Sequence, residues 1–219
     1  MPTPGTSQSQ EPTTGILLAG GRATRMGGSD KALRPLGGVP LLARVITILR
    51  PQCDALVISA NGKVARFTEF GLPIVADEIE DYAGPLAGIL AGLDFLAARR
   101  SPPAFAVTVS TDTPFLPADL VVRLHASRAA AGADIACARS NGASHPVIAL
   151  WPLGIRPALR QALAENLRKV DRFTSRYAVA YADWPVAAVD PFFNINAPED
   201  LAAAEHILRT QGDRNGVIP

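Results

Sequence analysis

Short apolar runs alternate along the chain with longer segments in which apolar residues recur at helical spacing. The runs 55–60 and 104–110 are almost wholly apolar and are flanked by turn residues. Such runs are typical of strands that are buried on both faces of a parallel sheet. We therefore predict strands at 15–19, 55–60, 73–76, 104–110, 134–138 and 146–150.

The segments between these runs carry helical patterns. Residues 40–50 begin with proline, which is favoured in a first helical turn, and place Leu42, Val45 and Leu49 on one stripe. The predicted helices are 40–50, 86–99, 117–130 and 198–209. The alternation predicts a three-layer, Rossmann-like α/β fold around a mainly parallel, mixed sheet.

A polar N-terminal segment precedes the first strand. Residues 1–13 are rich in Pro, Ser, Thr and Gln, and they lack the basic start and apolar core of a secretory signal. We expect them to form a disordered tail. No Pro- or Gly-rich linker divides the rest, so residues 14–219 are predicted to be a single domain.

Composition removes several classes of partner. The formal net charge is +1, so no whole-molecule field attracts nucleic acid or an anionic membrane, and we expect neither as a partner. No apolar run approaches the length needed to cross a bilayer. Cys53 and Cys137 are expected to be buried apolar residues in a reducing compartment, which predicts a cytoplasmic protein.

A glycine-rich, basic segment follows the first predicted strand, in "GILLAGGRATRMGGSDK", residues 15–31. It begins at the carboxyl edge of the sheet, where open α/β sheets bind ligands. Glycines let the backbone approach a phosphate, and Arg22, Arg25 and Lys31 supply positive charge. The dinucleotide-binding and P-loop patterns are both absent. A flexible surface loop with incidental basic residues remains the alternative.

This segment resembles the loop L-A-G-G-x-x-x-R-M-G-x-x-K of nucleotidyltransferases that activate sugars and cofactors. Arg25-Met26-Gly27-Gly28 followed by Asp30-Lys31 is most similar to the molybdenum cofactor guanylyltransferase family. In that family the loop surrounds the triphosphate of GTP, and the fold is that of nucleotidyltransferases. The resemblance implies a GTP site lined by Leu18, Ala19, Gly20, Gly21, Arg25 and Lys31.

Asp112 stands in "VTVSTDTPFLPADL", just after the apolar strand 104–110. A carboxylate at this edge can hold Mg²⁺, which takes few protein ligands besides substrate phosphates. An aspartate that only caps a turn is the alternative. The resemblance implies the metal-binding role for Asp112, with Mg²⁺ as the cofactor.

Two more segments extend the nucleotide side of the resemblance. In "VADEIEDYAGPLAG", the family's aspartate contacts the guanine nucleotide, and this implies the same role for Asp77. A turn aspartate is again the alternative. In "VISANGK" the family has asparagine at two positions, of which this chain keeps Asn61 and has Ser59 at the other. Asn61 is therefore a candidate for contact with the base or ribose.

The second half of the chain resembles the pterin side of the family. "SHPVIALW" contains His145, and a lone histidine is more often a structural or surface residue than a catalytic one. "RKVDRF" begins with Arg168 and Lys169, and its alternative is a solvated cationic helix face. "FFNINAPEDL" places Asn194 and Asn196 at a strand end facing the site, and Asn196 also fits an N-cap of the last helix.

The resemblance covers about residues 14–209 and implies transfer of GMP from GTP to molybdenum-carrying molybdopterin, with release of pyrophosphate. The catalytic residues would be Arg25, Lys31 and Asp112. A molybdenum-insertion protein and molybdoenzyme chaperones are implied partners. A cytidylyltransferase of the same cofactor or a sugar-phosphate nucleotidylyltransferase would use the same loop and carboxylate. A non-catalytic nucleotide-binding assembly factor is disfavoured, because binding alone would not require Lys31 and Asp112 together.

Overall fold

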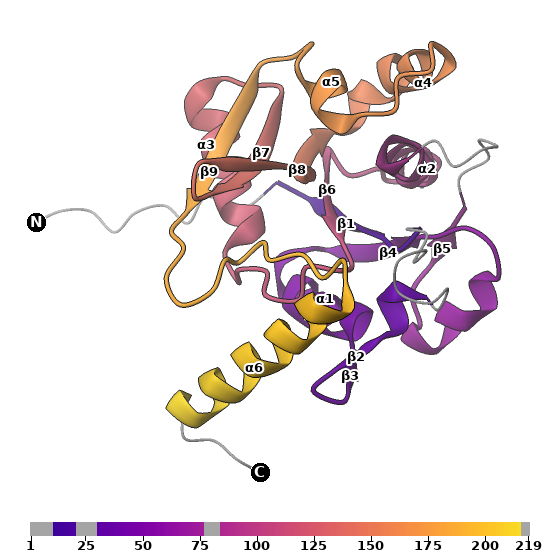
Figure 1. Ribbon diagram of the computed structural model, residues 1–219. Coiled ribbons are helices and arrows are strands. Elements are labelled where there is room, and N and C mark those ends of the chain that lie inside the picture. Colours follow the sequence, from indigo (N-terminus) through magenta and orange to yellow (C-terminus); the bar gives the residue numbers. More distant parts are fainter. Residues whose placement is uncertain (1–10, 21–29, 77–83, 216–219) are drawn as a thin grey trace, which may run out of the picture.

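The computed structural model describes residues 11–20, 30–76 and 84–215, with side chains as far as Thr210. In this part of the chain the central sheet has seven strands in the order β5-β4-β1-β6-β8-β7-β9 (Figure 1). Only β8 runs antiparallel to its neighbours, and the other pairs in the sheet are parallel. The strands are β1 (Thr13–Leu18), β4 (Ala55–Ser59), β5 (Ile74–Val75), β6 (Phe105–Ser110), β7 (Ile135–Ser140), β8 (Ala143–Pro152) and β9 (Val179–Trp184).

Helices cover both faces of this sheet. One apolar core lies between the sheet and α1 (Leu41–Leu49) and α3 (Leu120–Ala131). The other lies beneath α2 (Pro85–Ala97), α4 (Arg156–Ala164) and α5 (Val170–Thr174). Short 3₁₀ turns connect the layers: η2 (Lys31–Leu33), η3 (Arg50–Gln52), η4 (Val64–Phe70) and η5 (Leu153–Ile155).

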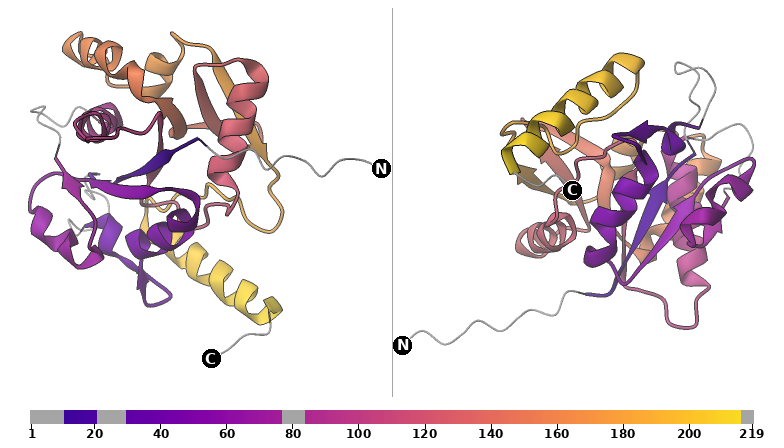
Figure 2. Two further views of the ribbon diagram at one scale, coloured as in Figure 1. Left: turned by 180° about the vertical axis from the view of Figure 1, so that it is seen from behind. Right: turned by 90° about the horizontal axis from the view of Figure 1, so that it is seen from below.

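The last helix, α6 (Pro198–Asn215), projects from the body of the molecule (Figure 2). Its first half packs on a small hairpin formed by β2 (Pro35–Leu36) and β3 (Val39–Pro40). Leu36, Leu41, Ile195 and Ala204 are buried in this third apolar cluster. The hairpin directly follows η2, so α6 lies beside the segment that carries Lys31.

Glycines bring α2 unusually close to the sheet. A Cβ at Gly92 would lie 2.7 Å from Cδ1 of Ile16 in β1, and one at Gly88 would lie 2.9 Å from Oγ of Ser59 in β4. Any larger residue would push the helix away from the strands. The start of α2 is therefore held next to the carboxyl ends of β1 and β4.

The predicted three-layer α/β fold is confirmed, and the predicted strands and helices occur within a few residues of their positions. The first strand begins at Thr13 rather than residue 15, inside the predicted tail, because the Thr13 N–H donates to Asp54 Oδ2 at 2.7 Å. β9, α4, α5 and the β2–β3 hairpin were not predicted from the sequence. β9 is an edge strand with Tyr181 and Asp183 exposed, so it lacks a long apolar run. Cys137 is buried, as predicted, and Cys53 is half-buried.

Candidate active site

Strand register places four residues in a row at one edge of the sheet. Leu18 of β1 pairs with Ser59 on one side and Ser110 on the other, and Ser59 also pairs with Val75. These are the last residues of four parallel strands, so the four strands end side by side at one edge of the sheet. The carboxyl edge, where α/β proteins bind ligands, is thus the edge that carries the predicted residues.

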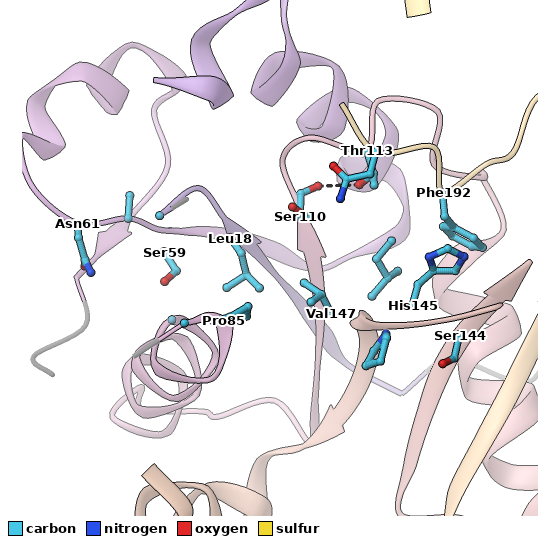
Figure 3. Close-up of a pocket in the computed structure, with 17 residues that line it drawn as sticks. Leu18, Ser59, Asn61, Pro85, Ser110, Thr113, Ser144, His145, Val147 and Phe192 are labelled. Atoms are coloured by element: carbon cyan, nitrogen blue, oxygen red, sulfur yellow. Dashed lines mark hydrogen bonds between the residues drawn. The ribbon is translucent and has the colours of Figure 1, made fainter. Parts of the chain in front are cut away.

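A pocket of about 590 Å³ opens along this edge. Figure 3 shows Asn61, Ser59 and Pro85 on one side, His145, Ser144 and Phe192 on the other, with Leu18, Ser110 and Val147 between them. Of the predicted site residues, the pocket is lined by Leu18, Gly20, Asn61, His145 and Asn194. Ala19 lies behind the lining, buried, and its N–H donates to the carbonyl of Ser59 at 2.8 Å.

Lys31 and Asp112 meet in an ion pair beside this pocket. Lys31 Nζ donates to Asp112 Oδ2, and both side chains are largely buried, with 15% and 12% of their surfaces exposed. Ser110, which lines the pocket, donates its hydroxyl proton to the other carboxylate oxygen, Oδ1. Both oxygens of Asp112 are therefore occupied by donors. Two of the three predicted catalytic residues, Lys31 and Asp112, thus come together although 81 positions separate them in sequence.

The segment before α6 completes this cluster. Asn196 Oδ1 accepts a second hydrogen bond from Lys31 Nζ at 2.7 Å. The Ile195 N–H donates to the main-chain carbonyl of Asp112 at 3.0 Å, which ties the segment to the strand end.

Two predictions about this segment are wrong. Residues 193–196 form an irregular connection rather than a strand end. Asn196 does not cap α6, because its side chain is directed to Lys31. Asp200 instead accepts from the N–H groups of Asn196 and Ala197, at 2.8 and 2.9 Å.

Both ends of the glycine-rich segment lie at the site. Gly20 lines the pocket, and Asp30 pairs with Arg66 of η4. Arg66 also donates to the carbonyl of Asn61 at 3.0 Å, so one side chain connects the end of this segment with the pocket wall. Gly21, Arg25 and Asp77 lie outside the described residues. Their proposed roles stay predictions.

The antiparallel direction of β8 explains why His145 reaches this edge. Because β8 runs opposite to β6, its first residues lie beside the last residues of β6 and β7. The His145 ring packs on Phe192 with a centroid distance of 4.8 Å. Its Nε2 lies 2.8 Å from Ser140 Oγ, and Ser140 donates to Asp190 Oδ2 at 3.0 Å. Burial lowers the pKa of His145, and the Asp190 carboxylate opposes this in part.

The structure does not bring Arg168 and Lys169 into the pocket lining. Arg168 donates to the carbonyl of Leu163 at 3.4 Å and to Asn166 Oδ1 at 3.0 Å, within its own loop. Lys169 is exposed. The main chain of Arg168 lies closer to the pocket than its side chain does, because a Cβ at Gly84, which lines the pocket, would lie 3.3 Å from the Arg168 carbonyl oxygen. These residues lie at the rim, next to the start of α2.

The donor set suits a hard divalent cation that is shared with a phosphate substrate. Asp112 offers carboxylate oxygens at the edge of the pocket, beside a lysine that can bind phosphate. Within the described residues, no three His, Cys, Asp or Glu side chains gather into a metal cage. Mg²⁺ commonly uses one or two carboxylates and completes its shell with substrate phosphates and water. The residues present fit such an ion.

Three further residues at the site were not predicted from the sequence: Ser110, Ser140 and Asp190. A signal for Ser140 was available, because Asn141-Gly142 is a preferred pair for a two-residue hairpin turn. Both residues have positive φ, 47° and 74°, and the turn joins β7 to β8. That turn fixes the register that places Ser140 near His145. Asp190 lies in an irregular connection after β9, and its place follows only from the tertiary fold.

Comparison with known proteins shows which family the chain resembles. A family model described as a MobA-like NTP transferase domain matches residues 15–182. A molybdenum cofactor guanylyltransferase from Rhodopseudomonas palustris (strain BisB5) is 57% identical over 196 residues, which cover 89% of this chain and 93% of that protein.

Solved structures share the fold. Molybdopterin-guanine dinucleotide biosynthesis protein A from Archaeoglobus fulgidus has a TM-score of 0.71 at 24% identity, covering 90% of this chain and 99% of its own. A complex of Rv0371C from Mycobacterium tuberculosis with manganese has a TM-score of 0.62 at 17% identity, covering 89% and 98%. The family match spans most of the described strands and pocket residues, and the chain belongs to the MobA-like NTP transferase domain family.

Proposed function

We propose that this protein transfers GMP from GTP to the terminal phosphate of molybdenum-carrying molybdopterin and releases pyrophosphate. The observation that carries the proposal is the Lys31–Asp112 pair at the carboxyl edge of the sheet, beside a pocket of about 590 Å³. The close similarity to a molybdenum cofactor guanylyltransferase supports the choice of GTP and of the acceptor.

The reaction needs no protein nucleophile. An oxygen of the acceptor phosphate attacks the α-phosphorus of GTP, a new P–O bond forms, and the bond to the bridging oxygen of the β-phosphate breaks with its electron pair leaving on pyrophosphate. The acceptor is already an anion, so the protein has to align the two phosphates and neutralise their charge. Lys31 can neutralise phosphate charge with its ammonium group.

Asp112 is the residue that would hold Mg²⁺, with Ser110 fixing the direction of its carboxylate. Bound there, Mg²⁺ would neutralise charge on the triphosphate and on the leaving pyrophosphate. Asn196 holds Lys31 next to Asp112. Arg25, Gly21 and Asp77 are proposed to complete the nucleotide site, and Asn61 to contact the base or ribose.

The two ends of the pocket suggest how the substrates divide it. Gly20, Ser59, Asn61 and the start of α2 offer main-chain and small polar groups, which suit the nucleotide. His145, Phe192 and Asn194 at the other end offer an aromatic surface and hydrogen-bonding groups, which suit a heterocycle. Arg168 and Lys169 are proposed to lie near the acceptor phosphate at the rim.

We place the reaction in the cytoplasm, where GTP is supplied, and the two free cysteines agree with a reducing compartment. Burial raises the pKa of each thiol to about 12, so neither is a reactive nucleophile near neutral pH. No helix among the described residues is long and apolar enough to span a membrane. A molybdenum-insertion protein and molybdoenzyme chaperones are proposed partners on the supplying and receiving sides.

Pyrophosphate release with GTP or CTP tests the proposal directly. The purified chain is incubated with Mg²⁺, molybdenum-loaded molybdopterin and one nucleotide at a time. We expect release with GTP, dependent on the acceptor, and at least about ten times less with CTP. Equal or greater release with CTP would overturn the choice of base. No release with either nucleotide would overturn the reaction.

A further inference from the structure

Ser140 and Asp190 surround His145 at the acceptor end of the pocket. Ser140 is the last residue of β7 and is buried, with 1% of its surface exposed. Its hydroxyl lies between two groups: Asp190 Oδ2 at 3.0 Å and His145 Nε2 at 2.8 Å. Asp190 is in turn fixed, because its Oδ1 accepts from the Phe192 N–H at 2.9 Å. The four residues form one continuous chain of hydrogen bonds.

The chemistry of this chain fixes where its protons lie. A carboxylate can only accept, so the single proton of the Ser140 hydroxyl is used in the bond to Asp190. Toward His145 the hydroxyl oxygen must therefore act as the acceptor. The imidazole has to donate, which places its proton on Nε2.

The other ring nitrogen of His145 is then an acceptor. In a neutral imidazole with Nε2 protonated, Nδ1 carries a lone pair. Nδ1 is on the ring edge away from Ser140, His145 lines the pocket, and among the described residues no hydrogen bond to Nδ1 is found. Figure 3 shows the His145 ring next to Phe192, and the two rings pack in a tilted arrangement with an interplanar angle of 43°.

Phe192 is itself held by its neighbours. Its ring packs edge-to-face on Trp184 at 5.3 Å, and the Trp184 indole N–H donates to Asp119 at 2.9 Å. The imidazole is thus fixed on one edge by Ser140 and on one face by Phe192. Such rigid support gives a hydrogen bond to a substrate its directional selectivity.

We propose that Ser140 and Asp190 are positioning residues that hold His145 in the Nε2–H form, so that Nδ1 accepts a hydrogen bond from an N–H group of the acceptor substrate. The inference rests on the proposed function for the identity of that substrate. A reduced pterin offers ring N–H and amino donors of this kind. An oxidised or alkylated heterocycle without the donor would leave Nδ1 unpaired and would bind more weakly.

The proton arrangement can be tested without any substrate. Histidine labelled with ¹⁵N at both ring positions reports the tautomer, because protonated and unprotonated ring nitrogens have widely separated chemical shifts. The chain has three histidines, and a His145→Gln variant assigns the signals. We expect His145 to be neutral and protonated at Nε2 at pH 7.5. An Nδ1–H form in the wild-type protein would overturn the proposal.

Asp190→Asn gives the sharpest variant. Its amide oxygen can still accept from the Phe192 N–H, which leaves the amide NH₂ group facing Ser140. The amide then donates to the Ser140 oxygen, Ser140 donates to His145 Nε2, and the proton of the imidazole moves to Nδ1. We expect the tautomer to invert, whereas a purely structural role of Asp190 would leave it as it is. An unchanged tautomer would contradict the proposal.

Kinetics provide the second readout. Ser140→Ala and Asp190→Asn should each raise KM for molybdenum-loaded molybdopterin about 10- to 100-fold, with KM for GTP unchanged. Ser140→Thr retains the hydroxyl and should restore most of the loss. Ser175→Ala, at the exposed end of α5, is the matched control and should have no effect.

The outcomes separate the two proposals. Failure of the GMP-transfer assay with a normal Nε2–H signal would reject the proposed reaction and leave the proton arrangement standing. Transfer by the wild-type protein with unchanged KM in Ser140→Ala and Asp190→Asn would reject the role of His145 alone. If Ser140→Ala does not fold, the Asp190→Asn spectrum decides, because that substitution preserves the shape of the side chain.

Discussion

The two halves of the pocket use opposite kinds of chemistry. Next to the proposed nucleotide side, Lys31 and Asp112 form a charged pair, and in the proposed reaction each group would exchange its partner when the triphosphate and the metal bind. On the proposed acceptor side, His145 is held by contacts with Ser140 and Phe192, and neither contact involves a charged partner. Charged side chains suit a step that moves phosphate charge, whereas a fixed neutral acceptor suits recognition of a heterocycle.

The difference also concerns how each half is held. The charged pair joins residues from η2, from the end of β6 and from the segment before α6. The hydrogen bonds that link His145, Ser140 and Asp190 join one hairpin, β7–β8, to the connection after β9. The charged half therefore depends on distant elements, and disturbing the α6 junction should reach Lys31.

The largest effect should come from Asp112→Asn, which removes the charge of the proposed metal-binding group and keeps its shape. We expect kcat to fall by about 10³-fold, the scale on which loss of a preorganised electrostatic group acts. Far-UV circular dichroism should be unchanged. Asp171→Asn, on the exposed side of α5, should retain full activity. Activity of Asp112→Asn within about tenfold of wild type would remove Asp112 from the catalytic residues.

Lys31→Gln should separate catalysis from metal binding. The ammonium group occupies Asp112 Oδ2, so a metal that binds this oxygen must compete with it. We expect kcat to fall about 100-fold, because phosphate charge is less well neutralised, whereas Mn²⁺ should bind more tightly when no nucleotide is present. Electron paramagnetic resonance of free Mn²⁺ measures the second effect.

The control for this variant is Lys63→Gln, an exposed lysine in the neighbouring loop, which should change neither property. Weaker binding of Mn²⁺ by nucleotide-free Lys31→Gln would show that lysine and metal do not compete for Asp112.

Ser110→Ala tests how much the direction of the carboxylate matters. Its hydroxyl donates to Asp112 Oδ1, and loss of such a supporting bond commonly costs 10- to 100-fold in metal affinity or activity, so we expect a loss of about 10-fold. KM for the acceptor should not change, which distinguishes this variant from those at Ser140. A selective rise in KM for molybdopterin would mean that Ser110 serves the other half.

The smallest effect concerns stability near pH 6. Burial lowers the pKa of both His125 and His145 in the folded protein. Unfolded histidines take up protons near pH 6.5, so below that pH the unfolded state binds more protons and the free energy of unfolding decreases. Each full unit of pKa difference corresponds to about 1.4 kcal/mol.

Urea unfolding at pH 7.5, 6.5 and 5.5 measures this decrease. It should be smaller in His145→Gln, and smaller again when His125 is also replaced. A free energy of unfolding that increases as the pH is lowered from 7.5 to 5.5 would contradict the lowered pKa of these two histidines.

The sequence predicted the charged half better than the neutral half. Asp112 follows a long apolar strand, and the glycine-rich segment ends at Lys31, so both mark a strand edge that the hydrophobic pattern alone locates. Their contact required the topology, because parallel strands bring their carboxyl ends together. The neutral half depends on β8 running antiparallel and on Asp190 in a connection without a periodic pattern. Neither feature is visible in local composition.

Two details show where local rules gave the wrong answer. Asn196 has the residue type and position of an N-cap, yet its side chain binds Lys31 because that partner is charged and close. β9 alternates buried and more exposed residues, so it lacks the apolar run that predicted the other strands. In both cases a tertiary contact determined the outcome.

The most direct test of GMP transfer follows a radioactive phosphate from GTP into the product. With [α-³²P]GTP, Mg²⁺ and molybdenum-loaded molybdopterin, the account predicts that the label appears in a guanine dinucleotide of the acceptor, whereas [γ-³²P]GTP places it in pyrophosphate. Asp112→Asn should abolish both signals. Label from the γ-position in the acceptor, or release of free GMP without a dinucleotide, would contradict transfer at the α-phosphate.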